Sequence, residues 1–241
     1  IFNDLSGFGR CSISVILPIL SAMGHQGVAI PTAVLSMHTE FPHYHMIDLS
    51  DQLPAYLESY RKEGLRFDAL CTGFLSNPTQ AQIARSCLQL LMGDGGRPYP
   101  TITKEIITQM RSLASEAGVL LPNLTELCLL CGRPYPDAFP SRDFLLSCCE
   151  ELCAAGTRNV VVSGLELDGR CCSFIYAEGK ADEVWNEKVG EGRPGSGDVF
   201  AAVIAGSLLR HETLHQSVER AARFVEAAMR KTLQEQAPHA W

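Results

Sequence analysis

The sequence predicts one α/β domain in which a mostly parallel sheet is covered by helices on both faces. Short apolar runs that suit buried strands alternate along the chain with longer segments of helical periodicity. The 241 residues suffice for one large domain, and no linker, internal repeat or low-complexity segment divides them. Apolar residues make up 46% and charged residues 20% of the chain, as in ordinary globular proteins. We therefore treat residues 1–241 as a single domain.

The elements of the first half follow from helix caps and apolar periodicity. Ser12 is a favoured N-cap residue, and Gly24 and Gly64 are favoured residues for closing a helix. The expected elements are helix 13–23, strand 27–31, helix 51–63, strand 67–73, helix 78–91 and helix 103–116.

The second half continues the alternation and ends in two helices. Gly132 marks the end of one helix, and two alternating segments indicate a pair of antiparallel strands. The expected elements are strand end 119–122, helices 125–130 and 141–155, strand 159–164, antiparallel strands 170–176 and 183–188, and helices 197–211 and 214–234.

Charge and hydropathy exclude several classes of function. Twenty Lys and Arg against 27 Asp and Glu give a net charge of −7, and no basic run exists, which argues against nucleic-acid binding. The longest apolar stretches, such as 199–209, contain Gly or Ser and are shorter than the roughly 20 residues of a membrane span. The first ten residues lack the pattern of a signal peptide. These features predict a cytoplasmic protein without a membrane or nucleic-acid partner.

Ten cysteines lie mostly inside apolar segments. Disulfide frameworks belong to small secreted chains, which this chain does not resemble. The one CxxC motif, Cys128 to Cys131, lacks the second CxxC or His pair of a specific zinc site. We interpret the cysteines as free thiols that serve as small buried hydrophobic residues.

The glycine-rich segments are the best candidates for chemistry. No GxxxxGK[ST] motif exists, and Gly7 to Ser12 begins like a dinucleotide fingerprint but lacks its third glycine. The strongest segment is PGSGDVFAA, residues 194–202, in which small residues precede an apolar helix. Such a helix directs free N–H groups toward a bound anion, and Asp198 in its first turn could accept a proton from a hydroxyl group. A simple helix N-terminus with a dipole partner is the alternative interpretation.

Five ordered motifs extend this pattern over essentially the whole chain. The GSGD segment resembles the GTGD motif of the ribokinase-like superfamily, whose three-layer sandwich the chain is expected to share. The remaining motifs are similar to those of pyridoxal (pyridoxine/pyridoxamine) kinases: DLSGFGRCS at 4–12 with LPILSAMG at 17–24, PTAVLSMHT at 31–39, MGD at 92–94, PNLTE at 122–126 and VSG at 162–164.

The resemblance implies phosphorylation of the 5′-hydroxymethyl group of a B6 vitamer by Mg²⁺·ATP, in a homodimer that salvages pyridoxal 5′-phosphate. It leaves open the preferred vitamer and whether a monovalent cation assists. Asp198 would be the base, with the amides of Gly195, Ser196 and Gly197 as the anion hole. The implied substrate-binding residues are Ser6, Ser36, His38, Thr39, Glu40 and Phe41. The implied ATP-binding residues are Asp94, Tyr99, Asn123, Glu126 and Ser163, of which Asp94 and Glu126 would also hold the metal.

Several of these residues also have a purely structural interpretation. Glu126 near a helix start is stabilising without a metal, and Asp94 lies in GDGG, a turn sequence. Ser6 could cap a turn, His38 could satisfy a loop carbonyl, and Tyr99 could cover a loop.

One departure from the family pattern concerns the sheet. The family has a strand ending in Asp-Pro-Val before its Met-Gly-Asp motif, whereas here helix 78–91 runs directly into Met92. A parallel sheet without an interior strand leaves the neighbouring strands without ladder partners. Because both sides of the gap match cleanly, we expect the natural protein to carry residues between Leu91 and Met92. An intact mass well above 26.3 kDa would support this expectation.

Two other functions remain open at this stage. A hydroxymethylpyrimidine (phosphate) kinase of thiamine synthesis shares the GxGD motif, and its substrate also carries a hydroxymethyl group on a flat ring. A non-catalytic vitamer-binding protein is the other alternative, although such a protein would not need Asp198.

Overall fold

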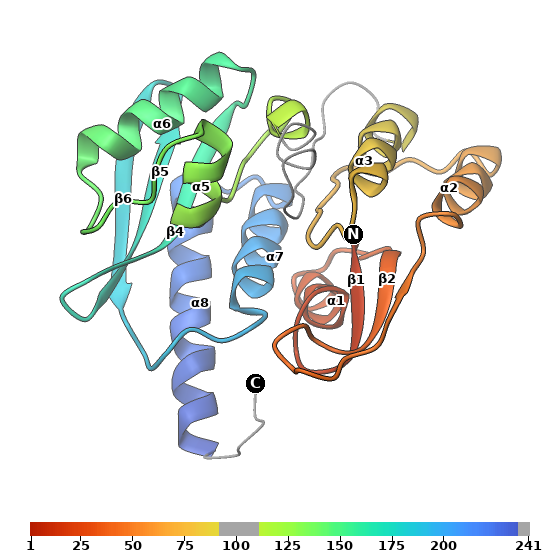
Figure 1. The fold of residues 1–241 in the computed structure, drawn as a ribbon, viewed down its shortest axis with the longest axis horizontal. Helices are drawn as coiled ribbons and strands as arrows, with labels where there is room; N and C mark the ends of the chain where they lie inside the picture. The colour runs from red at the N-terminus through yellow and green to blue at the C-terminus, as the bar shows by residue number, and fades with distance from the viewer. Residues whose placement is uncertain (92–110, 236–241) are drawn as a thin grey trace.

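The strands form two three-stranded sheets in the computed structural model, which describes residues 1–91 and 111–235 (Figure 1). The first sheet has the order β1-β2-β3, with β1 and β2 parallel and β3 antiparallel to β2. The second sheet is an antiparallel meander of β4, β5 and β6. The strands are β1 (Phe2–Phe8), β2 (Ile30–Met37), β3 (Met46–Asp48), β4 (Asn159–Leu167), β5 (Arg170–Ala177) and β6 (Lys180–Glu187).

Helices cover both faces of these sheets, as the predicted three-layer arrangement requires. The helices are α1 (Ile13–Ala22), α2 (Leu53–Lys62), α3 (Pro78–Leu91), α5 (Leu124–Cys131), α6 (Arg142–Ala154), α7 (Ser196–Leu209) and α8 (Leu214–Glu235). Helices α5 and α6 pack on one face of the meander, and α7 and α8 pack on the other. Helix α1 packs against α7 and joins the two groups, while α2 and α3 cover β1 and β2. Most predicted helices are confirmed within two residues; of helix 103–116 the described part shows residues 111–114 helical.

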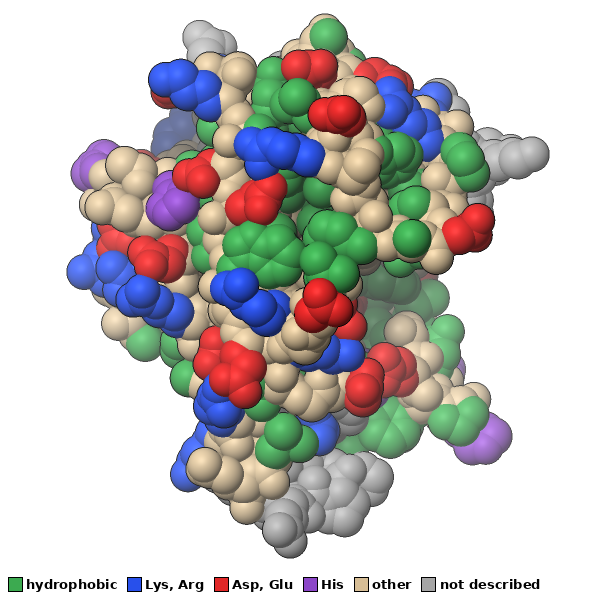
Figure 2. Space-filling view, turned by 90° about the vertical axis from the view of Figure 1, so that its left-hand side faces the viewer, with side chains coloured by type: hydrophobic (Ala, Val, Ile, Leu, Met, Phe, Trp, Pro, Cys, Tyr) green, Lys and Arg blue, Asp and Glu red, His purple; other side chains and the backbone are tan. Residues whose placement is uncertain are grey.

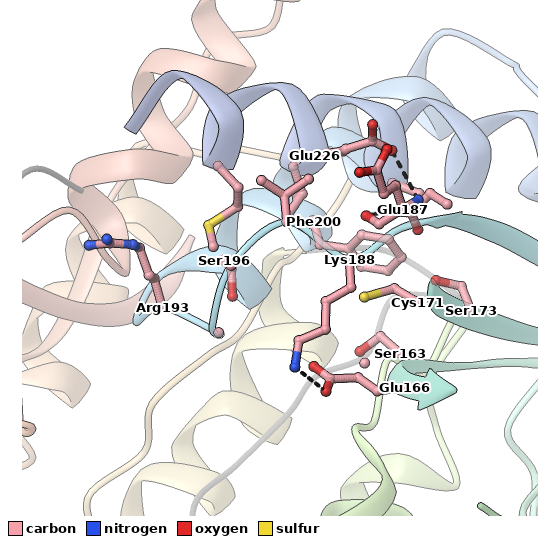
Figure 3. Close-up of a pocket in the computed structure, with 18 of the residues that line it drawn as sticks. Ser163, Glu166, Cys171, Ser173, Glu187, Lys188, Arg193, Ser196, Phe200 and Glu226 are labelled. Carbon is pink, nitrogen blue, oxygen red and sulfur yellow. Dashed lines mark hydrogen bonds and ion pairs between the residues drawn. The ribbon is translucent and has the colours of Figure 1, made fainter. Parts of the chain in front are cut away.

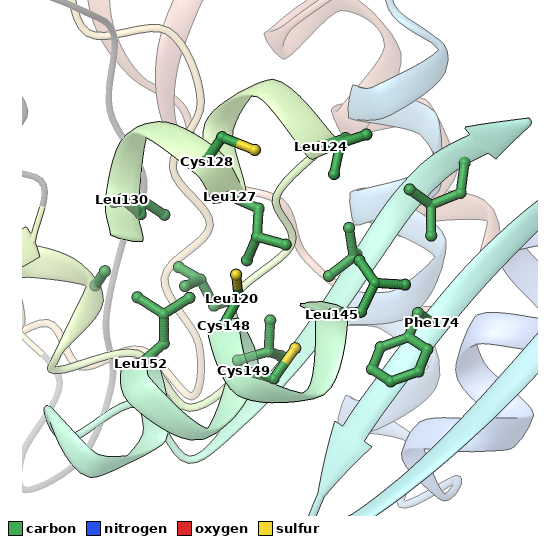
Figure 4. Packing of buried hydrophobic residues seen from close by; sticks show 14 of the residues in the cluster. Leu120, Leu124, Leu127, Cys128, Leu130, Leu145, Cys148, Cys149, Leu152 and Phe174 are labelled. Carbon is green, nitrogen blue, oxygen red and sulfur yellow. The ribbon is translucent and has the colours of Figure 1, made fainter. Parts of the chain in front are cut away.

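The largest core lies between α5, α6 and the meander (Figure 4). Leu127, Val160 and Phe174 are fully buried there, and each such side chain contributes about 1.5–3 kcal/mol through burial. Cys128, Cys148 and Cys149 pack among them as hydrophobic side chains. All ten cysteines are free thiols; six are buried, as their predicted hydrophobic role requires, and four are half-buried.

Three predicted strands differ from the structure. Segments 67–73 and 119–122 contribute only isolated parallel bridges, from Thr72 to Phe2 and from Leu120 to Val160. Among the described residues each segment has a bridge partner on one side only, and the lack of a second ladder partner is a physical reason for their irregularity. Strand 27–31 is displaced, because β2 begins at Ile30 and continues to Met37. Among the described residues, β1 and β2 form the one parallel pair of named strands, and the other three strand pairs are antiparallel. The isolated bridges are parallel as well.

The surface carries charges of both signs. On the face seen from the side of α6 and β6, Lys and Arg alternate with Asp and Glu around a group of hydrophobic side chains (Figure 2). Within residues 1–91 and 111–235, no helix combines the length and the apolar character needed to cross a membrane.

Candidate active site

The GSGD segment forms a tight turn that starts α7. Gly195 has a φ of 83°, in the left-handed region, and a Cβ at this position would lie 2.0 Å from the Arg10 carbonyl oxygen. Only glycine therefore allows α7 to approach the loop between β1 and α1 so closely. The first N–H groups of α7 lack partners inside the helix and make its N-terminus suitable for an anion. The Ser196 N–H already donates to the Arg193 carbonyl at 3.2 Å, so an anion would compete for that amide.

Asp198, in the first turn of α7, is held by two donors from the other end of the chain. The Asn3 side chain donates to Oδ1 at 3.2 Å, and the Ser12 backbone N–H donates to Oδ2 at 2.8 Å. Burial raises the pKa of the Asp198 carboxyl group, nearby Asp4 raises it further, and the two donors oppose this rise. Such a carboxylate is fixed in orientation and is suited to accept a proton.

The Ser12 backbone is strained where it contacts Asp198. Its φ of 54° is unusual for a residue with a side chain, and its hydroxyl makes no capping hydrogen bond to α1. Ser12 is the N-cap residue of α1, as predicted, but it does not cap the helix through its side chain. Its backbone conformation instead directs the N–H group at Asp198.

An inner cavity of about 200 Å³ lies in front of Asp198. Its lining residues are Asp4, Ser6, Cys11, Ser12, Leu35, His38, Thr39, Glu40, Phe74, Pro194, Gly195 and Asp198. The Ser6 hydroxyl donates to Asp4 Oδ2 at 2.9 Å, and both residues are buried. Burial raises the pKa of the Cys11 thiol, which keeps this thiol protonated.

Four of the six predicted substrate residues meet in this cavity: Ser6, His38, Thr39 and Glu40. Ser36 is not among its lining residues, because it alternates with Leu35 along β2 and its hydroxyl accepts the His45 N–H at 2.9 Å. Phe41 does not line the cavity either; its ring packs 4.6 Å from the His38 ring and 5.7 Å from the Phe8 ring. Contact of Ser36 and Phe41 with the substrate stays a prediction, since neither residue is among those that line the inner cavity.

An outer cavity of about 190 Å³ lies beyond the same turn (Figure 3). Among its lining residues are Ser163, Arg193, Ser196 and Gly197. Its apolar wall comes from α7 and α8, and the Lys188 ammonium group pairs with Glu166 at 2.7 Å on the opposite side. This pairing raises the pKa of the Lys188 ammonium group. The predicted Asp94 and Tyr99 lie outside the described residues.

Asn123 and Glu126 form a capping box at the start of α5. The Asn123 side chain accepts the Glu126 N–H at 2.9 Å, and the Glu126 carboxylate accepts the Asn123 N–H at 2.9 Å. Asn123 also forms a parallel bridge with Ser163, next to the outer cavity. Burial raises the pKa of Glu126. Within the described residues no group of three or more His, Cys, Asp or Glu side chains is arranged to hold a metal, so a metal role for Glu126 stays a prediction.

The GSGD turn therefore contributes residues to both the inner and the outer cavity. Pro194, Gly195 and Asp198 face the inner cavity, whereas Ser196 and Gly197 face the outer one. A base on one side and a helix N-terminus between the cavities suit the transfer of an anionic group to a hydroxyl group. Sequence reasoning missed Asn3 and Asp4, although two polar residues inside a first strand are a signal that could have found them.

The fold and this site define the class of protein as a ribokinase-like phosphotransferase. The family model described as phosphomethylpyrimidine kinase matches residues 17–240. The chain therefore belongs to the phosphomethylpyrimidine kinase family.

Three relatives illustrate the range of this family. A Bacteroides thetaiotaomicron protein assigned as a phosphomethylpyrimidine kinase, crystallised with pyridoxal, is 31% identical with a TM-score of 0.89, covering 96% of this chain and 88% of its own. A pyridoxine/pyridoxal/pyridoxamine kinase of Bordetella avium is 27% identical over 92% of this chain and 81% of its own. A hydroxymethylpyrimidine/phosphomethylpyrimidine kinase of Aquifex aeolicus is 24% identical over 87% of this chain and 85% of its own.

Proposed function

We propose that the protein transfers the γ-phosphoryl group of Mg²⁺·ATP to the 5′-hydroxymethyl group of a B6 vitamer. The observation that carries the proposal is the position of Asp198, a half-buried carboxylate held by two donors at the turn between the inner and outer cavities. The inner cavity would hold the vitamer and the outer cavity the nucleotide.

In this mechanism the hydroxymethyl oxygen attacks the γ-phosphorus while its proton passes to the Asp198 carboxylate. The bond from the γ-phosphorus to the bridging oxygen breaks, and ADP leaves. The free amides at the start of α7 stabilise the negative charge on the transferred group. The strained Ser12 N–H and the Asn3 amide keep the base in one orientation, so that little reorganisation is needed during transfer.

The outer cavity has the chemistry that a nucleotide needs. Phe200, Val225 and Met229 supply an apolar wall for a base, and Arg193 and Lys188 supply cations for phosphates. Mg²⁺ bound to a nucleotide is usually held by one or two carboxylates together with phosphate oxygens and water. The half-buried Glu126 carboxylate fits this mode, with Asn123 and Ser163 beside it. The metal would neutralise phosphate charge.

The choice of acceptor rests on the inner cavity and on the relatives. Ser6, Thr39 and Glu40 offer hydroxyl and carboxylate groups to a ring with polar substituents, and a relative with 31% identity was crystallised with pyridoxal. A hydroxymethylpyrimidine kinase is the second candidate, favoured by the family model and by the Aquifex relative. A non-catalytic binder is disfavoured because it would not require a base held by two donors at Asp198.

A parallel phosphorylation assay tests the proposal. The protein is offered Mg²⁺·ATP with pyridoxal, pyridoxamine, pyridoxine or hydroxymethylpyrimidine, and the phosphorylated product is measured by mass spectrometry. We expect product from the B6 compounds. Product from the pyrimidine alone would assign the protein to the second candidate, and binding of pyridoxal without any product would favour the non-catalytic alternative. The need for ATP also supports the cytoplasmic location predicted from the sequence.

We also infer that the protein is a homodimer. Leu5, Val34 and Ile47 are neighbours across β1, β2 and β3, and these residues are 39%, 36% and 53% exposed. A row of apolar side chains on a sheet face suits contact with a second copy. Light scattering should give twice the chain mass, and Ile47→Asp should shift the protein toward the monomer. A wild-type monomer at micromolar concentration would contradict this inference.

A further inference from the structure

Asn3 has an unusual set of contacts for a residue outside the known motifs. It lies in β1 with only 1% of its surface exposed, and its side chain touches three separate parts of the chain. Its Oδ1 accepts the backbone N–H of Phe74 at 2.7 Å and that of Asp4 at 2.9 Å, while its Nδ2 donates to Asp198 Oδ1 at 3.2 Å. Because two backbone donors define the oxygen, the amide nitrogen must face the carboxylate.

The fold also leaves room for this side chain in one particular place. A Cβ on Gly73 would lie 2.1 Å from Asn3 Nδ2 and 2.4 Å from its Cγ. Gly73 itself is tied to β1, because its N–H donates to the Phe2 carbonyl at 3.1 Å. The absence of a side chain at Gly73 is therefore what allows the Asn3 amide to reach Asp198.

We propose that Asn3 is a positioning residue for the transfer reaction, which fixes the Asp198 carboxylate and favours its ionised form. This inference rests on the proposed function. His38 and Glu40 line the same cavity as Asp198. Besides the two donors, three titratable groups interact electrostatically with Asp198: the Asp4 carboxylate from β1, the Cys11 thiol from the following loop and the Cys71 thiol from the segment before Gly73. None of these groups is a cation, so the Asn3 amide and the Ser12 N–H supply the opposing partial charge.

Asn3→Asp is the most selective variant. The new carboxylate can still accept the N–H groups of Phe74 and Asp4, but in its ionised form it cannot donate to Asp198 and places a second negative charge beside it. We expect kcat to fall by about a hundred-fold, since hydrogen bonds to charged groups contribute substantially, while KM for ATP changes by less than about two-fold. The acid limb of the kcat/KM profile should move to higher pH, which a purely structural role would not cause.

Gly73→Ala provides an independent variant, because it displaces the Asn3 side chain without altering it. It should reproduce both the loss of kcat and the shift of the acid limb. Gly118→Ala is the matched control, since no atom outside its immediate chain neighbours lies within 4 Å of a Cβ at that position. It should leave both quantities unchanged.

A direct titration of Asp198 separates this inference from the proposed function. The carboxyl carbon is followed by NMR in labelled protein, with Asp198→Asn for assignment, in the wild type, Asn3→Asp and Gly73→Ala. A higher Asp198 pKa in both variants supports the inference, even if the wild type phosphorylates none of the four acceptors and the proposed function fails. An unchanged Asp198 pKa in Gly73→Ala, or an unchanged kcat in Asn3→Asp of an active enzyme, would overturn it.

Discussion

The inner and outer cavities of this protein differ in the kinds of side chain that surround them. Around the inner cavity the polar groups of Asn3, Asp4, Ser6 and Ser12 are buried and hydrogen-bonded to one another or to Asp198. The outer cavity combines an apolar wall with ion pairs that remain in contact with solvent, such as Lys188 with Glu166. Buried networks fix geometry, whereas solvated pairs contribute little energy and adapt. The comparison indicates that the inner cavity governs the chemical step and the outer cavity governs nucleotide affinity.

The largest expected effect comes from Asp198→Asn. Loss of the base should lower kcat by about 10³-fold while pyridoxal still binds. Burial raises the pKa of Asp198 in the folded state. Protonation of Asp198 therefore stabilises the fold fully below the unfolded-state pKa, and this stabilisation is lost as pH rises through the folded-state pKa. The neutral amide of the variant avoids the cost of holding a desolvated charge. The difference in melting temperature between the variant and the wild type should therefore be more favourable to the variant at pH 8 than at pH 4. Calorimetry and initial rates measure both effects, and unchanged turnover would refute the role of Asp198 as a base.

Gly195→Ala should have the next largest effect. A Cβ would collide with the Arg10 carbonyl oxygen, so the turn must move, and kcat should fall by about a hundred-fold. Gly24→Ala is a close control, because Gly24 has nearly the same φ, 84° against 83°, but open space around its Cβ. The control should cost about 1 kcal/mol of stability and leave kcat unchanged. Equal rates for the two variants would show that close approach at Gly195 is not needed.

A smaller effect is expected on the outer cavity. Lys188→Met removes the ion pair with Glu166 and should raise KM for ATP by about five-fold, with kcat within about two-fold of wild type. The change should shrink as salt is added, because exposed charges are screened. Steady-state kinetics at two ionic strengths tests this. A collapse of kcat would instead mean that Lys188 acts on the transferred group. It would contradict the assignment of nucleotide affinity to the outer cavity and of the chemical step to the inner cavity.

The smallest expected effect separates two roles of Glu126. Glu126→Gln should keep the capping box, since Gln also serves at this position, and should change unfolding free energy by less than about 0.5 kcal/mol. Asn123→Ala should cost about 1 kcal/mol by removing the cap. If Glu126 holds Mg²⁺, the Mg²⁺ concentration that gives half-maximal activity should rise about five-fold in Glu126→Gln. The same Mg²⁺ dependence in variant and wild type would leave Glu126 with a structural role alone.

The sequence predicted best those features that depend on local signals. Asn123 and Ser141 cap their helices through side chains, and Gly132 closes α5 in the left-handed conformation, so these helix bounds were confirmed closely. Segments 67–73 and 119–122 were harder, because strand formation depends on neighbours distant in the chain.

The candidate site divides in the same way. Asp198 and its glycines were found from a local pattern, whereas Asn3 and Ser12 contact Asp198 across 195 and 186 residues of sequence. The role of Ser36 stays a prediction, because a motif does not show which face of β2 a residue occupies. The roles of Asp94 and Tyr99 stay predictions, since both lie outside the described residues.

The hydrogen bonds of Asp198 also matter for the cooperativity of unfolding. Asp198 belongs to the half of the molecule that contains the meander, and its two donors belong to the half that contains β1 and α1. The described strands of the two sheets share no ladder, and this junction and the packing of α1 on α7 are among the contacts that connect the halves. A nucleotide and an acceptor bound on either side of the turn would link both halves and be released only when they separate. We therefore expect a broad thermal transition without ligands and a single sharp one with both.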